Sequence, residues 1–217
     1  MSDVTDDSLS DVAIDEERAQ KKRDVARLKT VAFQHGGAAT AILGIWLVLA
    51  QVSESSAGLV LQLVSVGAGF FGGALLAFLV HEWGHFSGAR LSGAVSPVLK
   101  ERRSFFMFNF KTAENSRAQF LGMSIGGPLG NWLLVLLVLL LLPWGTLAHA
   151  ALLATVVGVA INVCVFEFPV IARVSRGEDP AETVAQRLKE TGEPGLLKNM
   201  GLLVGLGLFL LLSLIHI

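Results

Sequence analysis

The sequence predicts an all-α polytopic membrane protein with about five transmembrane helices. Of the 217 residues, 53% are hydrophobic and 16% are charged, and the mean hydropathy is +0.61. The apolar residues also fall in blocks of roughly 20, which is the helical length that spans the hydrocarbon core of a bilayer. The lipid bilayer is therefore the first expected partner of the chain.

Five apolar blocks can be placed to within a few residues. They run approximately from 36 to 52, from 57 into a polar box at 81–85, from 124 to 142, from 147 to 171, and from 200 to the end. The single cysteine, Cys164, lies inside an apolar block, so an intrachain disulfide and a cysteine-based zinc finger are excluded. Residues 31–217 are expected to form one membrane-embedded domain.

Three polar segments complete the predicted organisation. Residues 1–30 are acidic and then basic, with few large apolar side chains, and are predicted to form a flexible tail. Residues 93–119 contain an aromatic run that is typical of a short β-hairpin at the membrane surface. Residues 172–199 are predicted to be a loop with a short surface helix near 180–190. No phosphate loop or nucleic-acid patch is visible in the sequence, so no nucleic-acid partner is expected.

The basic residues predict the orientation in the membrane. All 17 Lys and Arg residues lie before the first apolar block, between the second and third, or between the fourth and fifth. The other two connections, QVSESSA and PWGTLAHA, have none. Because Lys and Arg accumulate in cytoplasmic loops, the N-terminus is expected in the cytoplasm of a cell-membrane protein, with the 93–119 and 172–199 segments on the same side.

The residues that suggest chemistry are His81, Glu82 and His85, in the box HEWGH at the end of the second apolar block. Positions i and i+4 share one face of a helix, so both imidazoles can reach one metal ion. Zn²⁺ makes water a nucleophile near neutral pH, and the neighbouring Glu82 can accept the proton of that water. Ionisable groups are costly to bury in lipid, which favours a functional site over structural histidines.

Two stretches resemble the site-2 protease family of intramembrane zinc metalloproteases. The first is LVHEWGHFSGARLSG, which is similar to the family's signature helix, and the second is FLGMSIGGPLGNWLLVLL, which is similar to its Gly-Pro-x-x-Asn segment. The resemblance covers roughly residues 60–190 and implies a zinc metalloendopeptidase that cleaves a transmembrane protein substrate. It also implies that Asn131 holds the substrate or polarises the scissile carbonyl, although an interhelical hydrogen bond explains Asn131 equally well.

The third zinc ligand is where the chain departs from the family pattern, which has an Asp-Gly pair after the fourth core helix. The corresponding stretch, NVCVFEFPVIARVSRGEDPAETV, contains no such pair. We favour Asp179 as the ligand, although Asp179, Pro180 and Glu182 also fit a helix start that needs no metal. Glu167 is the alternative, because it lies about as far along its apolar block as His81 does along its own.

Two other classes of function remain open from the sequence. A membrane-embedded pseudoprotease would bind client helices without cleaving them, and the missing Asp-Gly pair supports it. An ion transporter would use the same His and Glu side chains along an ion path, but no paired inverted repeat is visible. Zinc content separates the protease from the pseudoprotease, since a protein without catalysis need not hold the metal.

Overall fold

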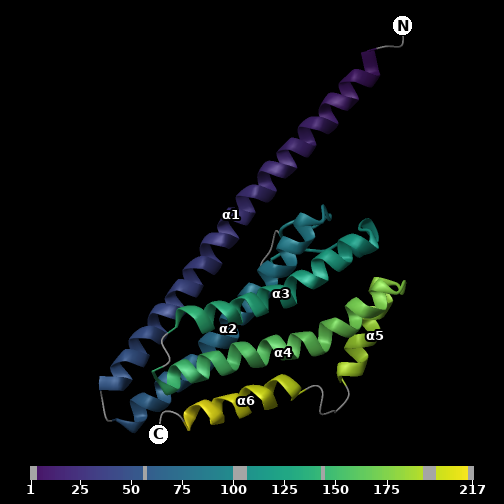
Figure 1. Cartoon of the computed structure of the whole chain (residues 1–217). Helices are drawn as coiled ribbons and strands as arrows, with labels where there is room; N and C mark the ends of the chain where they lie inside the picture. Colours follow the sequence, from purple (N-terminus) through teal and green to yellow (C-terminus); the bar gives the residue numbers. More distant parts are fainter. Residues whose placement is uncertain (1–3, 56–57, 100–106, 143–144, 193–198, 215–217) are drawn as a thin grey trace.

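The computed structural model describes residues 4–55, 58–99, 107–142, 145–192 and 199–214. In these ranges every regular element is a helix, which confirms the predicted all-α class. The helices are α1 (Val4–Ser55), α2 (Leu59–Leu91), η1 (Thr112–Glu114), α3 (Arg117–Leu141), α4 (Leu147–Ser175), α5 (Pro180–Gly192) and α6 (Met200–Ser213). Figure 1 shows that α4 lies between α3 and α6, while α1 crosses the bundle and extends well beyond it.

Four helices are long and apolar enough to cross a membrane. They are α2, α3, α4 and the Lys22–Ser55 part of α1. The predicted fifth block forms α6, which has 14 residues and is apolar. At ~1.5 Å per residue α6 is roughly 21 Å long, shorter than the ~30 Å hydrocarbon core. Residues 215–217 of this block lie outside the described part of the chain.

The N-terminal segment differs from the expected flexible tail, because residues 4–30 form the first part of α1. This stretch contains neither Gly nor Pro, and its Ala, Glu, Lys, Arg and Leu residues have high helix propensity. The same helix then continues into the apolar block without a break. The first polar segment and the first predicted span are therefore one continuous element.

The β-hairpin predicted within residues 93–119 was wrong for the part of that segment that the structure describes. Only one isolated antiparallel bridge forms there, between Val98 and Phe108. Further pairing is replaced by a side chain: Asn115 accepts a hydrogen bond from the Val95 N–H at 2.6 Å and donates to the Val95 carbonyl at 2.9 Å. Residues 112–114 then form the 3-10 helix η1. Of the aromatic residues that the structure describes here, Phe108 packs against Phe86 of α2 and Phe110 packs against Phe120 of α3.

The main core lies where α1, α2, α3 and α4 meet, and α4 contributes more of its buried residues than any other helix. Many large apolar side chains point outward instead, as in a helix bundle that faces lipid on its outer surface. The buried cluster consists of Trp46, Leu76, Ala77, Val135, Val138, Leu152, Leu153, Val156 and Ala160. This packing fixes α2, α3 and α4 relative to one another, and these three helices carry the candidate site.

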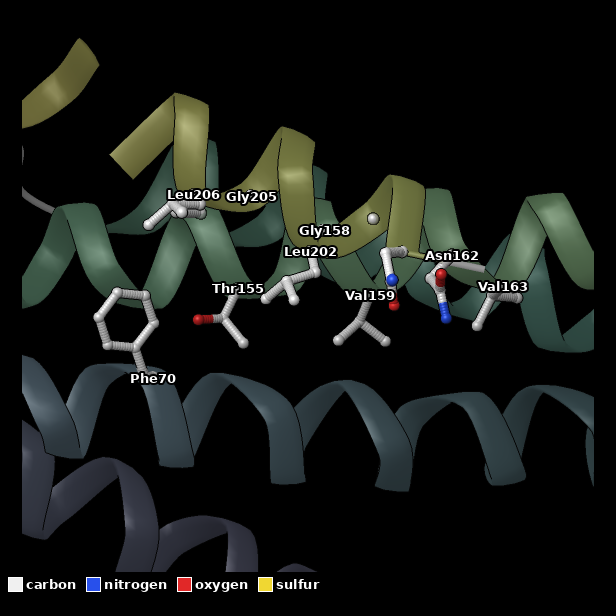
Figure 2. A pocket seen from close by; sticks show the side chains of 12 residues that line it. Phe70, Thr155, Gly158, Val159, Asn162, Val163, Leu202, Gly205 and Leu206 are labelled. Atoms are coloured by element: carbon white, nitrogen blue, oxygen red, sulfur yellow. The ribbon is translucent and has the colours of Figure 1, made fainter. Parts of the chain in front are cut away.

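A cavity of about 550 Å³, which we call the α6 cavity, lies between α2 and the paired helices α4 and α6. Figure 2 shows Phe70 of α2 facing Thr155 and Val159 of α4 across it. Small residues let α6 approach α4 closely; a Cβ on Gly158 would lie 2.6 Å from the Gly201 carbonyl oxygen. The cavity is predominantly apolar, with Asn162 at one end.

Candidate metal centre

The HEWGH box lies in the last three turns of α2, and His81 and His85 project from the same face. Their Nε2 atoms are 3.0 Å apart, and the ring centroids are separated by 4.3 Å. This is the geometry expected from i, i+4 spacing on a helix. Both side chains are largely buried, with about 15% and 13% of their surface exposed. The sequence-based expectation that the two imidazoles point to one place is met by the structure.

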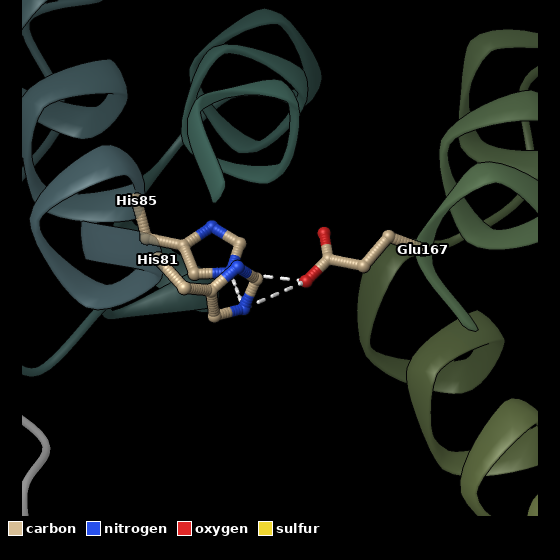
Figure 3. A group of neighbouring side chains, drawn as sticks. All are labelled: His81, His85 and Glu167. Carbon is tan, nitrogen blue, oxygen red and sulfur yellow. Dashed lines mark hydrogen bonds and ion pairs between the residues drawn. The ribbon is translucent and has the colours of Figure 1, made fainter. Parts of the chain in front are cut away.

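Glu167 of α4 completes this group. Its Oε1 atom lies 3.0 Å from Nε2 of His85 and 3.4 Å from Nε2 of His81. Figure 3 shows the carboxylate reaching across from α4 to the two imidazoles on α2. One ligand atom from each of the three residues lies within 4.8 Å of the others. In the part of the chain that the structure describes, these are the residues placed so that they could hold a metal ion together.

Helix α3 orients both imidazoles through hydrogen bonds to their Nδ1 atoms. Nδ1 of His81 lies 3.0 Å from Oδ1 of Asn131, and Nδ1 of His85 lies 2.8 Å from the carbonyl oxygen of Met123. Asn131 is buried and also donates from Nδ2 to the Ala77 carbonyl at 3.4 Å. A carbonyl or carboxamide oxygen at Nδ1 places the proton there, so each Nε2 keeps its lone pair for the space beside Glu167.

This contact requires glycine, because the α2 and α3 backbones nearly touch. A Cβ on Gly127 would lie 2.5 Å from Cε1 of His85 and 2.6 Å from Cε1 of His81. Gly84 of α2 and Gly126 of α3 face each other. A Cβ on either residue would overlap the carbonyl oxygen of the other. The paired glycines before Pro128 therefore let α3 approach closely enough to reach the histidines.

Glu82 is also buried, with 4% of its surface exposed, and lies on the same helix between the two histidines. It lines a cavity of about 520 Å³ together with His81, His85 and Glu167. The remaining wall is mainly aromatic and includes Phe78, Phe108, Phe110 and Phe166. We call this space the site cavity. Asn162 and Val163 line both the site cavity and the α6 cavity, so the two spaces share a wall.

Asp179, the metal ligand favoured from the sequence, is placed elsewhere. Its Oδ1 accepts a hydrogen bond from the Glu182 N–H at 2.9 Å, and its carbonyl accepts from Thr183. Asp179 is therefore the N-cap of α5, which was the competing interpretation of this stretch. The carboxylate that meets the histidines is Glu167, because α4 passes directly beside α2 at that depth.

Asn131 makes the interhelical hydrogen bond, which is one of the two roles that the sequence left open for it. Its carboxamide lies between His81 and the Ala77 carbonyl, on the α3 side of the imidazoles, and it is absent from the described lining of the site cavity. The structure thus supports the interhelical hydrogen bond rather than contact with substrate. Asn162 is the asparagine whose side chain borders the cavity.

Two contributors were not identified from the sequence. Gly127 keeps the space beside the imidazoles open, and the backbone carbonyl of Met123 orients His85. The Gly-Gly-Pro triplet was the available signal for Gly127, since adjacent glycines before a helix-internal proline indicate a close backbone approach. A backbone carbonyl leaves no trace in the residue types, so Met123 had no such signal.

Comparison with known proteins identifies no relative of this chain. No family model, no curated protein and no solved structure matches it. Function must therefore be inferred from the side chains of the site and their surroundings.

Proposed function

We propose that the chain is an intramembrane zinc metalloprotease in which His81, His85 and Glu167 are the protein ligands of Zn²⁺. The observation that carries this proposal is the convergence of two imidazole nitrogens and one carboxylate oxygen inside an apolar helix bundle. Two His and one Glu, with the fourth position open, is a ligand set used by catalytic zinc sites. The resemblance of the HEWGH and Gly-Pro segments to site-2 proteases supports the same class.

The distances within the group are close to those between zinc ligands. Ligand atoms ~2.0–2.1 Å from one tetrahedral ion lie about 3.3–3.4 Å from each other. The three distances among Nε2 of His81, Nε2 of His85 and Oε1 of Glu167 are 3.0, 3.0 and 3.4 Å. The acceptors at both Nδ1 atoms direct the Nε2 lone pairs toward each other, and such lone pairs repel unless a cation lies between them. This arrangement supports a metal ion in preference to two structural histidines.

The residues around the centre supply the remaining functions of a hydrolase. When bound, zinc would polarise the scissile carbonyl and make water more acidic. Glu82, adjacent to His81 and on the cavity wall, accepts a proton from water and returns it to the leaving amine. Glu82 is 4% exposed, which limits its contact with bulk water that would compete for this proton.

The substrate we propose is a transmembrane segment of another protein. The aromatic wall of the site cavity suits apolar side chains. The four long apolar helices support a centre inside a membrane-embedded bundle. The basic segments around Arg90, Lys111, Arg117 and Arg187 would face the cytoplasm with the N-terminus, and α6 would be a fifth membrane-embedded helix. In this orientation the centre lies toward the cytoplasmic end of α2.

The competing function is a pseudoprotease that binds client helices without zinc. One observation favours it: the cluster can be stable without a metal ion. A protonated His85 would form an ion pair with Glu167 at 3.0 Å. The two proposals differ in metal content. A protease requires about one zinc per chain, and the pseudoprotease requires none.

The decisive experiment measures zinc in protein purified in detergent without chelator. Wild-type protein should contain about one zinc per chain, and His81→Ala should lose it, because the remaining two ligands rarely hold zinc. Glu82→Gln should keep zinc but lower cleavage of transmembrane peptides by roughly 10²–10⁴-fold, since the amide cannot accept the proton. Zinc-free wild-type protein would overturn the protease proposal, and full activity of Glu82→Gln would overturn the role of Glu82.

A further inference from the structure

The helical turn that carries Glu167 has a broken hydrogen-bond pattern. Pro169 lies inside α4, two residues after Glu167. Proline has no backbone N–H, so the carbonyl of Val165, four residues earlier, has no helical donor. A proline ring also displaces that carbonyl from the helix axis and bends the chain. Because the centre lies in an apolar bundle, a carbonyl left without a donor would cost free energy.

Arg187 of α5 supplies the missing donor and a second hydrogen bond to the next carbonyl. Its Nη2 donates to the Val165 carbonyl at 2.6 Å, and its Nε donates to the Phe166 carbonyl at 3.3 Å. The guanidinium carbon also lies 5.9 Å from the centroid of the Phe166 ring. The Arg187 side chain is 14% exposed, so these hydrogen bonds are largely shielded from water. The two carbonyls belong to the residues immediately before Glu167.

Helix α5 is held in place to make this contact. Thr183 of α5 is fully buried, and Val184 packs against the cluster of Phe120, Val170 and Val174. The cap formed by Asp179 starts the helix, and Arg173 of α4 bonds to Gln186 of α5 at 2.5 Å. Arg187 is thus fixed at both ends, by its own helix and by the carbonyls that it binds.

We infer that Arg187 is a positioning residue that holds the Glu167 carboxylate in place for the metal. This inference rests on the proposed zinc centre and adds the element that controls its third ligand. Arginine suits this role because its rigid fork reaches two adjacent carbonyls at once, whereas the single ammonium of lysine acts as a point donor. Asp179 therefore contributes to the centre indirectly, by starting the helix that carries Arg187.

The first test measures Zn²⁺ affinity by competition with a chromophoric chelator, using full-length protein in detergent. Arg187→Met should weaken zinc binding, by up to about 10–100-fold, the scale of loss seen when a residue that orients a metal ligand is removed. Arg187→Lys should fall between Arg187→Met and wild type. Lys189→Met removes the same charge from an exposed position of α5 and should bind zinc as wild type does. Zinc affinity of Arg187→Met equal to wild type would overturn the inference.

The second test asks whether Arg187 acts through the carbonyl that Pro169 leaves without a donor. Pro169→Ala restores an N–H at position 169 that can donate to Val165. Arg187→Met should therefore cost less zinc affinity in the Pro169→Ala background than in wild type, a coupling that a double-mutant cycle measures. A purely structural loss of α5 would cost the same in both backgrounds and would contradict the inference.

The two proposals fail separately. Wild-type protein that binds no Zn²⁺ contradicts the zinc centre itself. Wild-type protein that binds Zn²⁺ with a loss in His81→Ala, but no loss in Arg187→Met, contradicts the role of Arg187 alone. Thermal unfolding of the zinc-free proteins monitors the fold independently, and the helical content of Arg187→Met should match wild type.

Discussion

Glu167 and Asp179 are the two carboxylates whose roles the structure separates most clearly. Glu167 meets both imidazoles, while Asp179 caps α5. The consequence is an asymmetric response to amide substitution. Glu167→Gln should abolish stoichiometric zinc, because the ligand set loses its charged oxygen.

Asp179→Asn is the matched control, because it makes the same chemical change at the cap. Asparagine caps a helix about as well as aspartate, so zinc content and unfolding temperature should remain close to wild type. Zinc analysis of the two purified variants checks this prediction. The reverse result, with zinc lost only in Asp179→Asn, would mean that Asp179, in the loop before α5, is the third ligand.

Gly127 gives a second prediction at the residue scale. A Cβ at this position would lie 2.5–2.6 Å from atoms of both imidazoles, which is shorter than van der Waals contact permits. Gly127→Ala should therefore displace the rings from Asn131 and Met123 and weaken zinc binding by about tenfold or more, the scale expected when ligand orientation is lost.

Gly67→Ala is the control for this change, since it makes the same substitution within α2 where a Cβ would meet nothing within 4 Å. It should leave zinc affinity unchanged. Competition titration of both variants checks the prediction. Wild-type affinity in Gly127→Ala would mean that α3 does not constrain the histidines.

At the scale of elements, the N-terminal half of α1 is attached to the segment that follows α2. Asp24 bonds to Arg90 at 2.6 Å and accepts the Val98 N–H at 2.8 Å. Leu28 packs nearby against Phe86 and its buried neighbours. Residues beyond the predicted apolar span thus hold the chain that lines the site cavity through Phe108.

Asp24→Ala should release this attachment. The Val98 N–H would lose its acceptor, which lowers the local opening free energy by about 1–3 kcal/mol. Hydrogen exchange of the Val98 amide should become faster by a corresponding factor. Asp24→Asn keeps an oxygen acceptor and should retain most of the protection. Unchanged exchange in Asp24→Ala would show that the apolar contacts alone hold the segment.

Sequence patterns predicted the elements whose determinants are local. The i, i+4 spacing placed His81 and His85 together, and the apolar blocks located four long helices. The choice between Glu167 and Asp179 depended on where the chain goes after Pro169, and no local pattern encodes the packing of α5 onto α4. The hairpin failed for a related reason: Asn115, far along the segment, takes the hydrogen bonds of Val95.

At the scale of the whole molecule, the proposed orientation is testable by cysteine labelling in a Cys164→Ala background. Lys111→Cys and Lys189→Cys should react from the cytoplasmic side, because the basic segments remain there. Ser55→Cys and Gly145→Cys lie in the connections at the other end of the bundle and should react from outside. Labelling of position 111 from the outer face would contradict this topology.

The candidate centre draws its side chains from helices that meet through glycine on both sides of α2: α3 at Gly127 and α4 at Gly69 and Gly73. Two ligands and their hydrogen-bond acceptors belong to one tightly joined pair of helices, while Glu167 belongs to α4. An ion bound by all three would therefore add a cross-link between α2 and α4. Separation of α4 from α2 would then be thermodynamically linked to metal occupancy. At a free-zinc concentration 100 times Kd, binding would stabilise the packed bundle by about 2.7 kcal/mol.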